Sequence, residues 1–195
     1  MVTMSVDWEH IPAKHRQLIK VFFDEADMSA DAIKTVDFPP AYGADIVVSC
    51  EKAKDPKNGS IYLKPTQFVL GIGCRRDTAF ENIDRAIRQS LLKLQIDISD
   101  IDMIASIDVK KDEPGIKEFC ERNRIDFVTY TADELMAVQG EFSASQFVRE
   151  HVGVDNVCER AAVLACSREC NKAGKLVYKK HKYDRVTVAA AKYPD

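Results

Sequence analysis

The sequence predicts an α/β fold: a three-layer sandwich with a largely parallel or mixed central sheet flanked by helices, plus a small amino-terminal subdomain. From residue 67 onward, short apolar stretches typical of buried strands alternate with amphipathic helical stretches, which is the pattern of a parallel sheet covered by helices. The last two predicted strands follow each other closely enough to pair antiparallel. Before residue 65 the pattern is less regular, which indicates a separate subdomain.

The domain boundary is predicted near Pro65, so that residues 1–66 form the small subdomain and residues 67–195 form the main α/β domain. The subdomain is expected to contain an amphipathic helix, two short strands and a turn cluster, at residues 13–26, 45–49, 61–63 and 55–59 respectively.

The stretch 69–83 is the most informative segment of the main domain. Residues 68–70 are apolar and predict a buried strand, and residues 71–76 (GIGCRR) predict a glycine turn. A helix is expected to follow, with Thr78 and Glu81 at capping-box spacing. A strand, a glycine turn and a helix N-terminus in this order can present backbone N–H groups to an anion.

Two interpretations of this turn are open. Arg75 and Arg76 add positive charge suited to carboxylates or phosphates, which favours an anion site. Alternatively, the glycines only let a strand turn tightly into a helix. A dinucleotide fingerprint is excluded because Arg76 occupies the place of its third glycine, and a phosphate loop is excluded because no Gly-Lys-Ser/Thr follows.

The remaining elements continue the alternation of strands and helices. Strands are expected at residues 103–107, 127–130, 176–178 and 186–189. The first helix has an apolar stripe at Phe80, Ile83, Ile87, Leu91 and Leu94. Further helix starts are marked by Pro114, by the pair Thr131 and Glu134, and by the pair Ser143 and Gln146. A helix of small residues at 161–165 is suited to close packing on the sheet.

Composition argues against several classes of protein. The net charge of −3 argues against general nucleic-acid binding, and no apolar run approaches the length of a membrane span. Charged residues interrupt the start of the chain, so no signal peptide is expected and the predicted location is cytoplasmic. The six cysteines form no Cys-x-x-Cys pair and the four histidines are scattered, so no metal site is predicted and the thiols are expected to be reduced.

Polar residues gather in three segments that should meet beyond the carboxyl ends of the parallel strands, where ligands bind in such sheets. The first is the turn at 71–76, and the second is 104–115, which follows a predicted strand and includes Ser106, Asp108, Lys110, Asp112 and Glu113. In one interpretation Asp112 caps the following helix and the other polar side chains, including Glu113, are solvated. In the other interpretation Asp112 and Glu113 belong to a ligand site. Asp108 is the stronger functional candidate because it lies where a buried strand meets its loop.

The third segment is 152–167, in which Cys158, Glu159 and Arg160 occupy the first helical turn. Glu159 is favourable there with the helix dipole, whereas Arg160 is not, so Arg160 calls for a ligand or an acidic partner. A Glu159–Arg160 pair that links this helix to a neighbour is the structural alternative. Cys74, at a helix start, could have a lowered pKa, but no adjacent histidine activates it and a structural thiol is favoured. The chemistry that this site suits is acid–base hydrolysis by water, with the arginines holding a polyanion.

Taken together, these motifs resemble a known family. The turn GIGCRR, the stretches SIDVK and DEPG at 106–115, GVDNVCERAAVLA at 153–165, and LVYKKHKYDRVTVA at 176–189 resemble the carboxyl-terminal domain of the cobalamin-biosynthesis protein CbiG and the related CobE. The resemblance runs from about residue 67 to 191, and residues 1–66 look like the end of the middle region of CbiG. One departure is Asp77, which stands where the family often has glycine.

The resemblance implies hydrolysis of the δ-lactone of cobalt-precorrin-5A to cobalt-precorrin-5B, with release of acetaldehyde, in anaerobic cobalamin biosynthesis. The candidate catalytic residues are Asp108 and Glu113, either of which could be the general base, with backbone N–H groups after Gly73 as oxyanion donors. The candidate substrate-binding residues are Gly71, Gly73, Cys74, Arg75, Arg76, Thr78, Ser106, Lys110, Glu159 and Arg160. No cofactor is implied, because the substrate carries the cobalt.

The expected partners are a cobalt-corrinoid intermediate, other corrin-pathway enzymes and a second copy in a homodimer, with neither nucleic acid nor a membrane. Family members with hydrolase activity usually carry a further amino-terminal domain, which is not within these 195 residues. A CobE-like module that binds or carries a tetrapyrrole without catalysis is therefore the alternative function. An α/β domain whose glycine turn binds some other anion is a third.

Overall fold

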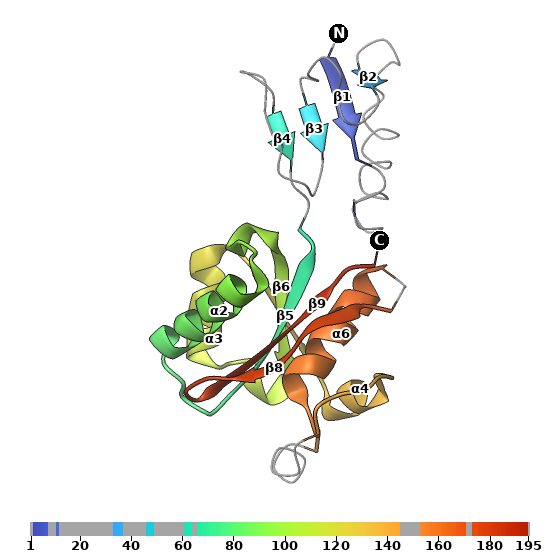
Figure 1. Ribbon diagram of the computed structural model, residues 1–195. Coiled ribbons are helices and arrows are strands. Elements are labelled where there is room, and N and C mark those ends of the chain that lie inside the picture. The colour runs from blue at the N-terminus through green and yellow to red at the C-terminus, as the bar shows by residue number, and fades with distance from the viewer. Residues whose placement is uncertain are drawn as a thin grey trace. The chain divides into compact units, whose positions relative to one another are not determined.

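The structure is a computed structural model, and it describes residues 2–7, 11, 33–36, 46–48, 61–63, 66–144, 153–170 and 173–194. The chain divides into two compact units, Met1–Thr66 and Gln67–Pro194 (Figure 1). Each unit is described by itself.

The first unit contains a parallel sheet with the strand order β2-β1-β3-β4. Its strands are β1 (Val2–Val6), β2 (Ile33–Val36), β3 (Ile46–Val48) and β4 (Ile61–Leu63). The strands predicted at 45–49 and 61–63 are confirmed as β3 and β4, whereas β1 and β2 were not predicted. The helix predicted at 13–26 and the turn predicted at 55–59 lie outside the described residues.

The second unit is built on a five-stranded mixed sheet with the order β7-β6-β5-β9-β8. Its strands are β5 (Phe68–Cys74), β6 (Ile101–Ile107), β7 (Asp126–Tyr130), β8 (Lys175–Lys182) and β9 (Val186–Lys192). β5, β6 and β7 run parallel, while β9 pairs antiparallel with both β5 and β8. The predicted α/β fold with a mixed sheet and an antiparallel final hairpin is confirmed.

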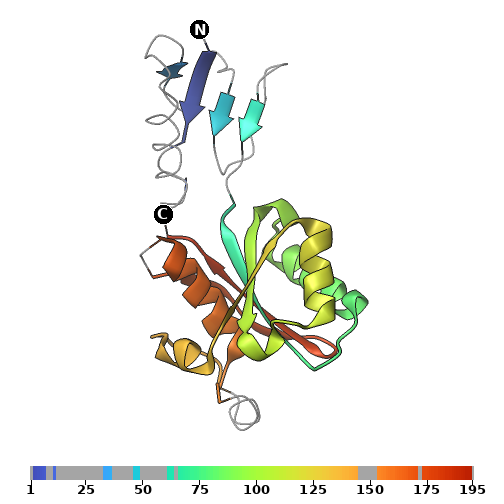
Figure 2. The same ribbon diagram turned by 180° about the vertical axis from the view of Figure 1, so that it is seen from behind.

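Helices cover both faces of this sheet (Figures 1 and 2). α2 (Phe80–Leu94) and α3 (Pro114–Asn123) pack on one face, with a core that includes Leu70, Ile72 and Ile104. α4 (Ala132–Ala137) and α6 (Val157–Cys170) pack on the other face, with a core that includes Val69 and Ala105. Two single turns of 3-10 helix, η1 (Ile98–Asp100) and η2 (Asp108–Lys110), flank β6. The three predicted layers are therefore present.

The glycines of the predicted turn at 71–76 lie inside a strand, so that prediction is wrong in part. β5 continues to Cys74 because β9 pairs with it along its whole length, from Phe68 opposite Lys192 to Cys74 opposite Val186. The chain reverses only after Cys74. A Cβ on Gly71 would lie 1.8 Å from the carbonyl oxygen of Cys158, so this glycine is needed because α6 packs directly on β5.

The predicted helix starts are partly right. Pro114 is the first residue of α3, and Thr131 with Glu134 forms a capping box at α4, both as predicted. The capping box predicted at Thr78 and Glu81 is wrong, because Ala79 is the N-cap of α2 and no side chain caps that helix. The predicted cap at Asp112 is also wrong, since the N-cap of α3 is Glu113. Gln146, of the start predicted with Ser143, lies outside the described residues.

Candidate functional site

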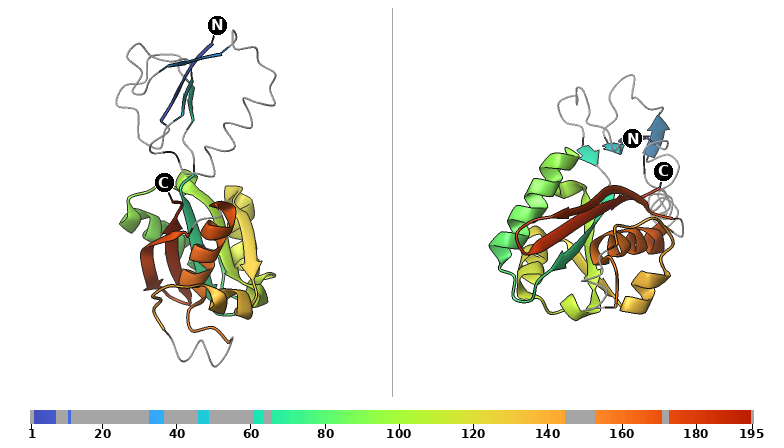
Figure 3. Two further views of the ribbon diagram at one scale, coloured as in Figure 1. Left: turned by 90° about the vertical axis from the view of Figure 1, so that its right-hand side faces the viewer. Right: turned by 60° about the horizontal axis from the view of Figure 1, so that its bottom comes forward.

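The carboxyl ends of β5, β6 and β7 define one edge of the second unit, which the right-hand view of Figure 3 brings forward. Here β5 leads into the loop 75–79 before α2, and β6 leads through η2 into α3. The first turn of α6 also lies at this edge, since a Cβ on Gly73 would lie 3.9 Å from the Cβ of Val157. Parallel strands place the loops that follow them at the same edge of the sheet. The three segments predicted from the sequence therefore lie at one edge.

Glu113 joins the loop after β5 to the loop after β6. Its Oε1 accepts a hydrogen bond from the backbone N–H of Thr78 at 2.9 Å, and its Oε2 pairs with the Nζ of Lys110 at 2.8 Å. The Oγ1 of Thr78 donates to the carbonyl oxygen of Arg75 at 2.7 Å. The Glu113 side chain is 4% exposed. The structure thus brings Arg75, Thr78, Lys110 and Glu113 together, and both carboxylate oxygens of Glu113 already have a partner.

The turn between β8 and β9 holds the arginine-bearing loop from its other side. The backbone N–H of Arg75 donates to the carbonyl oxygen of Arg185 at 3.0 Å, and Nη2 of Arg185 donates to the carbonyl oxygen of Arg76 at 2.8 Å. Arg185 was not predicted as a site residue. The signal that could have found it is the antiparallel pairing predicted for the last two strands, because that pairing returns their connection to the end of β5.

Arg75 and Arg76 are exposed, and neither guanidinium makes a hydrogen bond or an ion pair with any residue that the structure describes. Arg185, also exposed, lies against the same turn. Arg75, Arg76 and Arg185 bring three positive charges to this turn. Asp77 and Asp184 bring two negative charges, so a net positive charge remains for an anion to compensate. We call residues 75–78 the arginine turn. Together with Arg185, the arginine turn suits a ligand that carries several carboxylates.

Asp108 is the first residue of η2 and is exposed. Within the described part of the chain, its carboxylate has no hydrogen bond or ion pair. The neighbouring Val109 exposes 67% of its surface, so this loop offers an apolar contact beside a carboxylate. The catalytic role of Asp108 stays a prediction.

Cys74 is not a reactive thiolate. Burial raises the pKa of its thiol to about 11, and the nearby Lys110 ammonium lowers the pKa too little to offset burial. The thiol therefore stays protonated at neutral pH. A lowered pKa at this position, considered from the sequence, is excluded, and the structural interpretation is favoured.

Glu159 and Arg160 lie at the start of α6, on the face of the sheet opposite α2 and α3, and both are buried. Glu159 accepts hydrogen bonds from Ser143 and from the backbone N–H of Lys180. Arg160 pairs with Asp155 at 2.8 Å and donates to two carbonyl oxygens near α4. Arg160 therefore has the acidic partner that its helix position calls for, but that partner is not Glu159. Substrate binding by these two residues stays a prediction, and their contacts are those of a structural network.

Two further predicted residues are internal. Ser106 is fully buried and donates to the carbonyl oxygen of Ile72 at 2.7 Å, which ties β6 to β5. Gly73 lies in β5, where an added Cβ would be 2.8 Å from the Oγ1 of Thr187. Three of the predicted site residues, Arg75, Arg76 and Asp108, are therefore exposed. The buried ones are Gly71, Thr78, Ser106, Glu113, Glu159 and Arg160, and the remaining ones have intermediate exposure.

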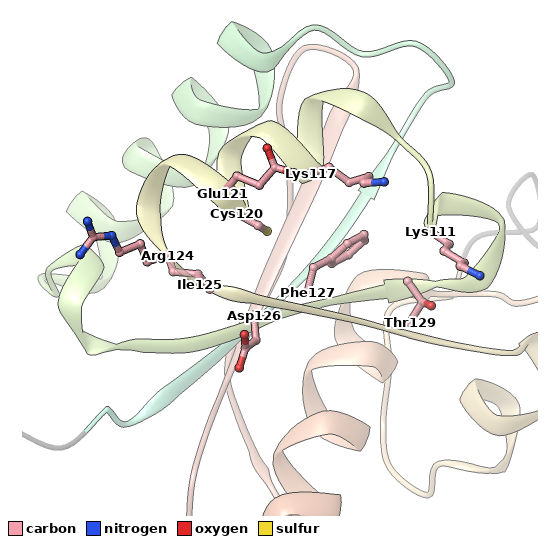
Figure 4. Close-up of a pocket in the computed structure, with 9 residues that line it drawn as sticks. All are labelled: Lys111, Lys117, Cys120, Glu121, Arg124, Ile125, Asp126, Phe127 and Thr129. Carbon is pink, nitrogen blue, oxygen red and sulfur yellow. The ribbon is translucent and has the colours of Figure 1, made fainter.

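A hollow of about 540 Å³ lies beside α3 and the edge strand β7 (Figure 4). It is lined by Lys111, Lys117, Cys120, Glu121, Arg124, Ile125, Asp126, Phe127 and Thr129. Lys111 and Lys117 lie toward one end of it and Arg124 lies toward the other, with the ring of Phe127 between them. Lys117 is within 3.6 Å of Asp112, and burial raises the pKa of Cys120 to about 12. The hollow was not predicted.

Within the described residues, no three histidine, cysteine, aspartate or glutamate side chains lie close enough together to hold a metal ion. Among the same residues, no helix is long and apolar enough to cross a membrane.

Residues 68–191 match the family model described as cobalamin synthesis G C-terminus. The chain belongs to this family. The matched residues include the arginine turn, η2, the start of α3 and the first turn of α6, which are the segments described above.

Curated relatives carry related names. A cobalt-precorrin-5A hydrolase from Salmonella typhimurium is 38% identical over 102 residues, which are 52% of this chain and 29% of that protein. A probable cobalt-precorrin-5A hydrolase from Methanocaldococcus jannaschii is 32% identical over 137 residues, or 68% of this chain and 42% of that protein. The chain thus spans less than half the length of these relatives.

Two solved structures resemble this chain. The crystal structure of CobE, a protein from the cobalamin biosynthetic pathway, has a TM-score of 0.61 and 25% identity, and the match covers 64% of this chain and 89% of CobE. A putative cobalamin biosynthesis protein G homologue from Sulfolobus solfataricus has a TM-score of 0.52 at 20% identity, with 99% of this chain and 51% of that chain covered. The latter likeness shows the fold alone.

Proposed function

We propose that this chain acts in cobalamin biosynthesis by binding a carboxylate-rich cobalt-corrinoid at the arginine turn, and that it hydrolyses the δ-lactone of cobalt-precorrin-5A with release of acetaldehyde. The observation that carries the proposal is the pair of exposed arginines, Arg75 and Arg76, whose guanidinium groups have no partner among the described residues. Both arginines lie within the residues that match the cobalamin synthesis G family model. Cobalt is part of the substrate, so the proposal requires no cofactor.

The proposed chemistry needs a water, a base and donors for an oxyanion. Water attacks the lactone carbonyl and the acyl C–O bond breaks, which leaves a carboxylate and an alcohol on the two-carbon fragment. The alcohol then loses its proton and forms the aldehyde C=O as the C–C bond to the macrocycle breaks. The macrocycle takes up the electron pair of that bond and a proton, and acetaldehyde leaves. Asp108 is the proposed base because its carboxylate is exposed at the end of β6, the strand that pairs with β5. Both carboxylate oxygens of Glu113, by contrast, have a partner, and its side chain is 4% exposed. The N–H groups at the start of α2 are the proposed oxyanion donors.

A second candidate function is binding of a corrinoid precursor without turnover. It is favoured by the structural likeness to CobE, since the match covers 89% of that protein. It is also favoured by Asp108, whose carboxylate no described residue orients.

One experiment separates the two candidates. Purified chain is incubated with cobalt-precorrin-5A, acetaldehyde is measured, and binding is followed by the change in the corrinoid absorption spectrum. Acetaldehyde formation supports the hydrolase. A spectral change without acetaldehyde, even at stoichiometric protein, supports the binding module. The absence of any spectral change would contradict both candidates.

The cytoplasmic location, the homodimer and contacts with other corrin-pathway enzymes stay predictions.

Arg75→Ala is expected to weaken corrinoid binding at least about tenfold, because a charge-assisted hydrogen bond contributes roughly 1.5–3 kcal/mol. The guanidinium supports no other described residue, so the melting temperature should not change. Arg88→Ala is the matched control, since Arg88 is exposed on α2 and, among the described residues, its side chain pairs only with Asp84. Equal affinities of the Arg75→Ala variant and the unchanged chain would locate the ligand elsewhere.

Asp108→Asn is expected to leave corrinoid affinity and the melting temperature unchanged while it lowers turnover by about two orders of magnitude, the usual contribution of a general base. The alternative is a structural role, in which the Asp108 carboxylate accepts hydrogen bonds from residues 71–76. No such hydrogen bond is present among the described residues. Asp112→Asn, a change of the same charge in the same loop, is the control. Full turnover by the Asp108→Asn variant would remove Asp108 from the mechanism.

A further inference from the structure

The arginine turn is held by the first residues of α3 through two separate features. The carboxylate of Glu113 accepts the backbone N–H of Thr78. In addition, Gly115 permits a close approach, because a Cβ at that position would lie 2.3 Å from the carbonyl oxygen of Thr78 and 3.2 Å from the backbone of Ala79. Both features meet the same stretch of backbone, which is the one that directs Arg75 and Arg76.

The contacts of Glu113 differ from those expected at its position. Glu113 is the N-cap residue of α3, yet its side chain does not cap that helix. Residues that usually cap a helix are shorter and bind an N–H group of their own first turn. Glu113 instead reaches across to the loop after β5, and its second oxygen binds Lys110. The Glu113 carboxylate therefore stabilises the loop after β5 and leaves the N-terminus of α3 without a side-chain cap.

We propose that Glu113 is a positioning residue of the corrinoid site: it holds the arginine turn against the β6–α3 loop and so acts on ligand binding through Arg75 and Arg76, without touching the ligand. The inference rests on the proposed function, because it requires that the arginine turn binds the ligand. It removes Glu113 as an alternative base and Lys110 as a ligand-binding residue. The Lys110 ammonium instead pairs with one carboxylate oxygen of Glu113 and leaves the other oxygen facing Thr78.

Glu113→Gln tests the proposal, because the side-chain amide has one acceptor where the carboxylate has two. Either the Thr78 N–H or the Lys110 ammonium then faces an NH₂ group. We expect amide hydrogen exchange at Thr78 to accelerate, and affinity for cobyrinic acid, a stable corrinoid with free carboxylate side chains, to fall by about tenfold. Glu118→Gln is the control, because Glu118 is a partly exposed glutamate on the same helix, paired with Arg122.

A rescue variant distinguishes positioning from a general loss of folding. In Lys110→Met/Glu113→Gln, the amide oxygen is available to Thr78 and the NH₂ group no longer faces an ammonium. We expect both the slow exchange of Thr78 and the affinity for cobyrinic acid to recover, although the pair of charges is gone. A melting temperature that falls equally in both variants while affinity recovers only in the second supports positioning.

Three results would count against these proposals in different ways. If Arg75→Ala weakens binding and Glu113→Gln does not, the inference fails and the proposed function stands. If Glu113→Gln abolishes turnover but leaves affinity and Thr78 exchange unchanged, Glu113 is a catalytic residue and the inference fails. If the unchanged chain does not bind cobyrinic acid or cobalt-precorrin-5A at all, the proposed function fails and the inference fails with it.

Discussion

Gly71→Ala is expected to lower the free energy of unfolding of the second unit by at least about 3 kcal/mol, the upper end of the usual cost of overpacking a core. The added Cβ would lie 1.8 Å from the carbonyl oxygen of Cys158 and 2.9 Å from the backbone nitrogen of Ala162. Both atoms belong to the backbone of α6, so no rotation of a side chain can relieve the contact. The helix would have to move off β5, and its buried alanines would lose their contact with the sheet.

Gly73→Ala is the matched control, because it makes the same change two residues along the same strand. There the nearest atom is the Oγ1 of Thr187, at 2.8 Å, and the next is 3.9 Å away. The threonine side chain can rotate, at the cost of its hydrogen bond to the carbonyl oxygen of Gly73, which should cost about 1 kcal/mol. Urea denaturation followed by circular dichroism measures both variants. If both variants lost the same free energy of unfolding, the close contact of α6 with Gly71 would not be the cause of the loss.

Gly71 also shows what the sequence could and could not predict. A glycine pair between an apolar run and a helix fits a turn and fits a strand under a close-packed helix, and no local pattern separates the two. The decisive contact is the pairing of β5 with β9, more than a hundred residues away in the chain, which extends the strand to Cys74. The strand–helix alternation, by contrast, depends on local periodicity, and that part of the fold was predicted.

Asp77 lies at a position where the resemblance stated in the sequence analysis leads us to expect glycine. In the structure, Asp77 adopts φ 54°, in the left-handed region that glycine enters freely and that aspartate enters more readily than most residues. The position therefore selects for backbone conformation, and a short polar side chain meets the requirement.

The candidate site was predictable to the extent that it depends on local sequence. Arg75 and Arg76 follow directly from a turn before a helix, and their exposure agrees with that expectation. The partner of Glu113 could not be predicted, because Thr78 is 35 residues away and a glutamate before Pro114 looks like a helix cap or a free acid. The contact of Arg185 with Arg76 depends likewise on which strands are neighbours, and that requires the topology of the sheet.

Glu159→Ala is expected to destabilise the second unit by at least about 3 kcal/mol, because it removes a buried acceptor from three partly buried donors. Glu159 is fully buried, and its carboxylate accepts the backbone N–H and the hydroxyl of Ser143 at 2.7 and 2.8 Å and the backbone N–H of Lys180 at 2.6 Å. The pairing of β8 with β9 shifts between Tyr178 and His181, and Lys180 lies in that irregular stretch. One carboxylate thus joins α6, the segment around Ser143 and the irregular part of β8.

Glu134→Ala is the control that isolates burial. Glu134 also accepts a backbone N–H near a helix start, in the capping box with Thr131, and it pairs with Arg168. Its side chain, however, is 36% exposed. Water can replace the lost carboxylate there, so the melting temperature of the Glu134→Ala variant should fall far less than that of the Glu159→Ala variant. Glu159→Gln should give an intermediate loss, because the amide keeps the volume but has only one acceptor oxygen. Hydrogen exchange at Lys180 should accelerate in both Glu159 variants and remain slow in Glu134→Ala. A Glu159→Ala variant as stable as Glu134→Ala, with Lys180 still protected, would mean that water reaches this carboxylate, and the role of Glu159 as a buried link would be wrong.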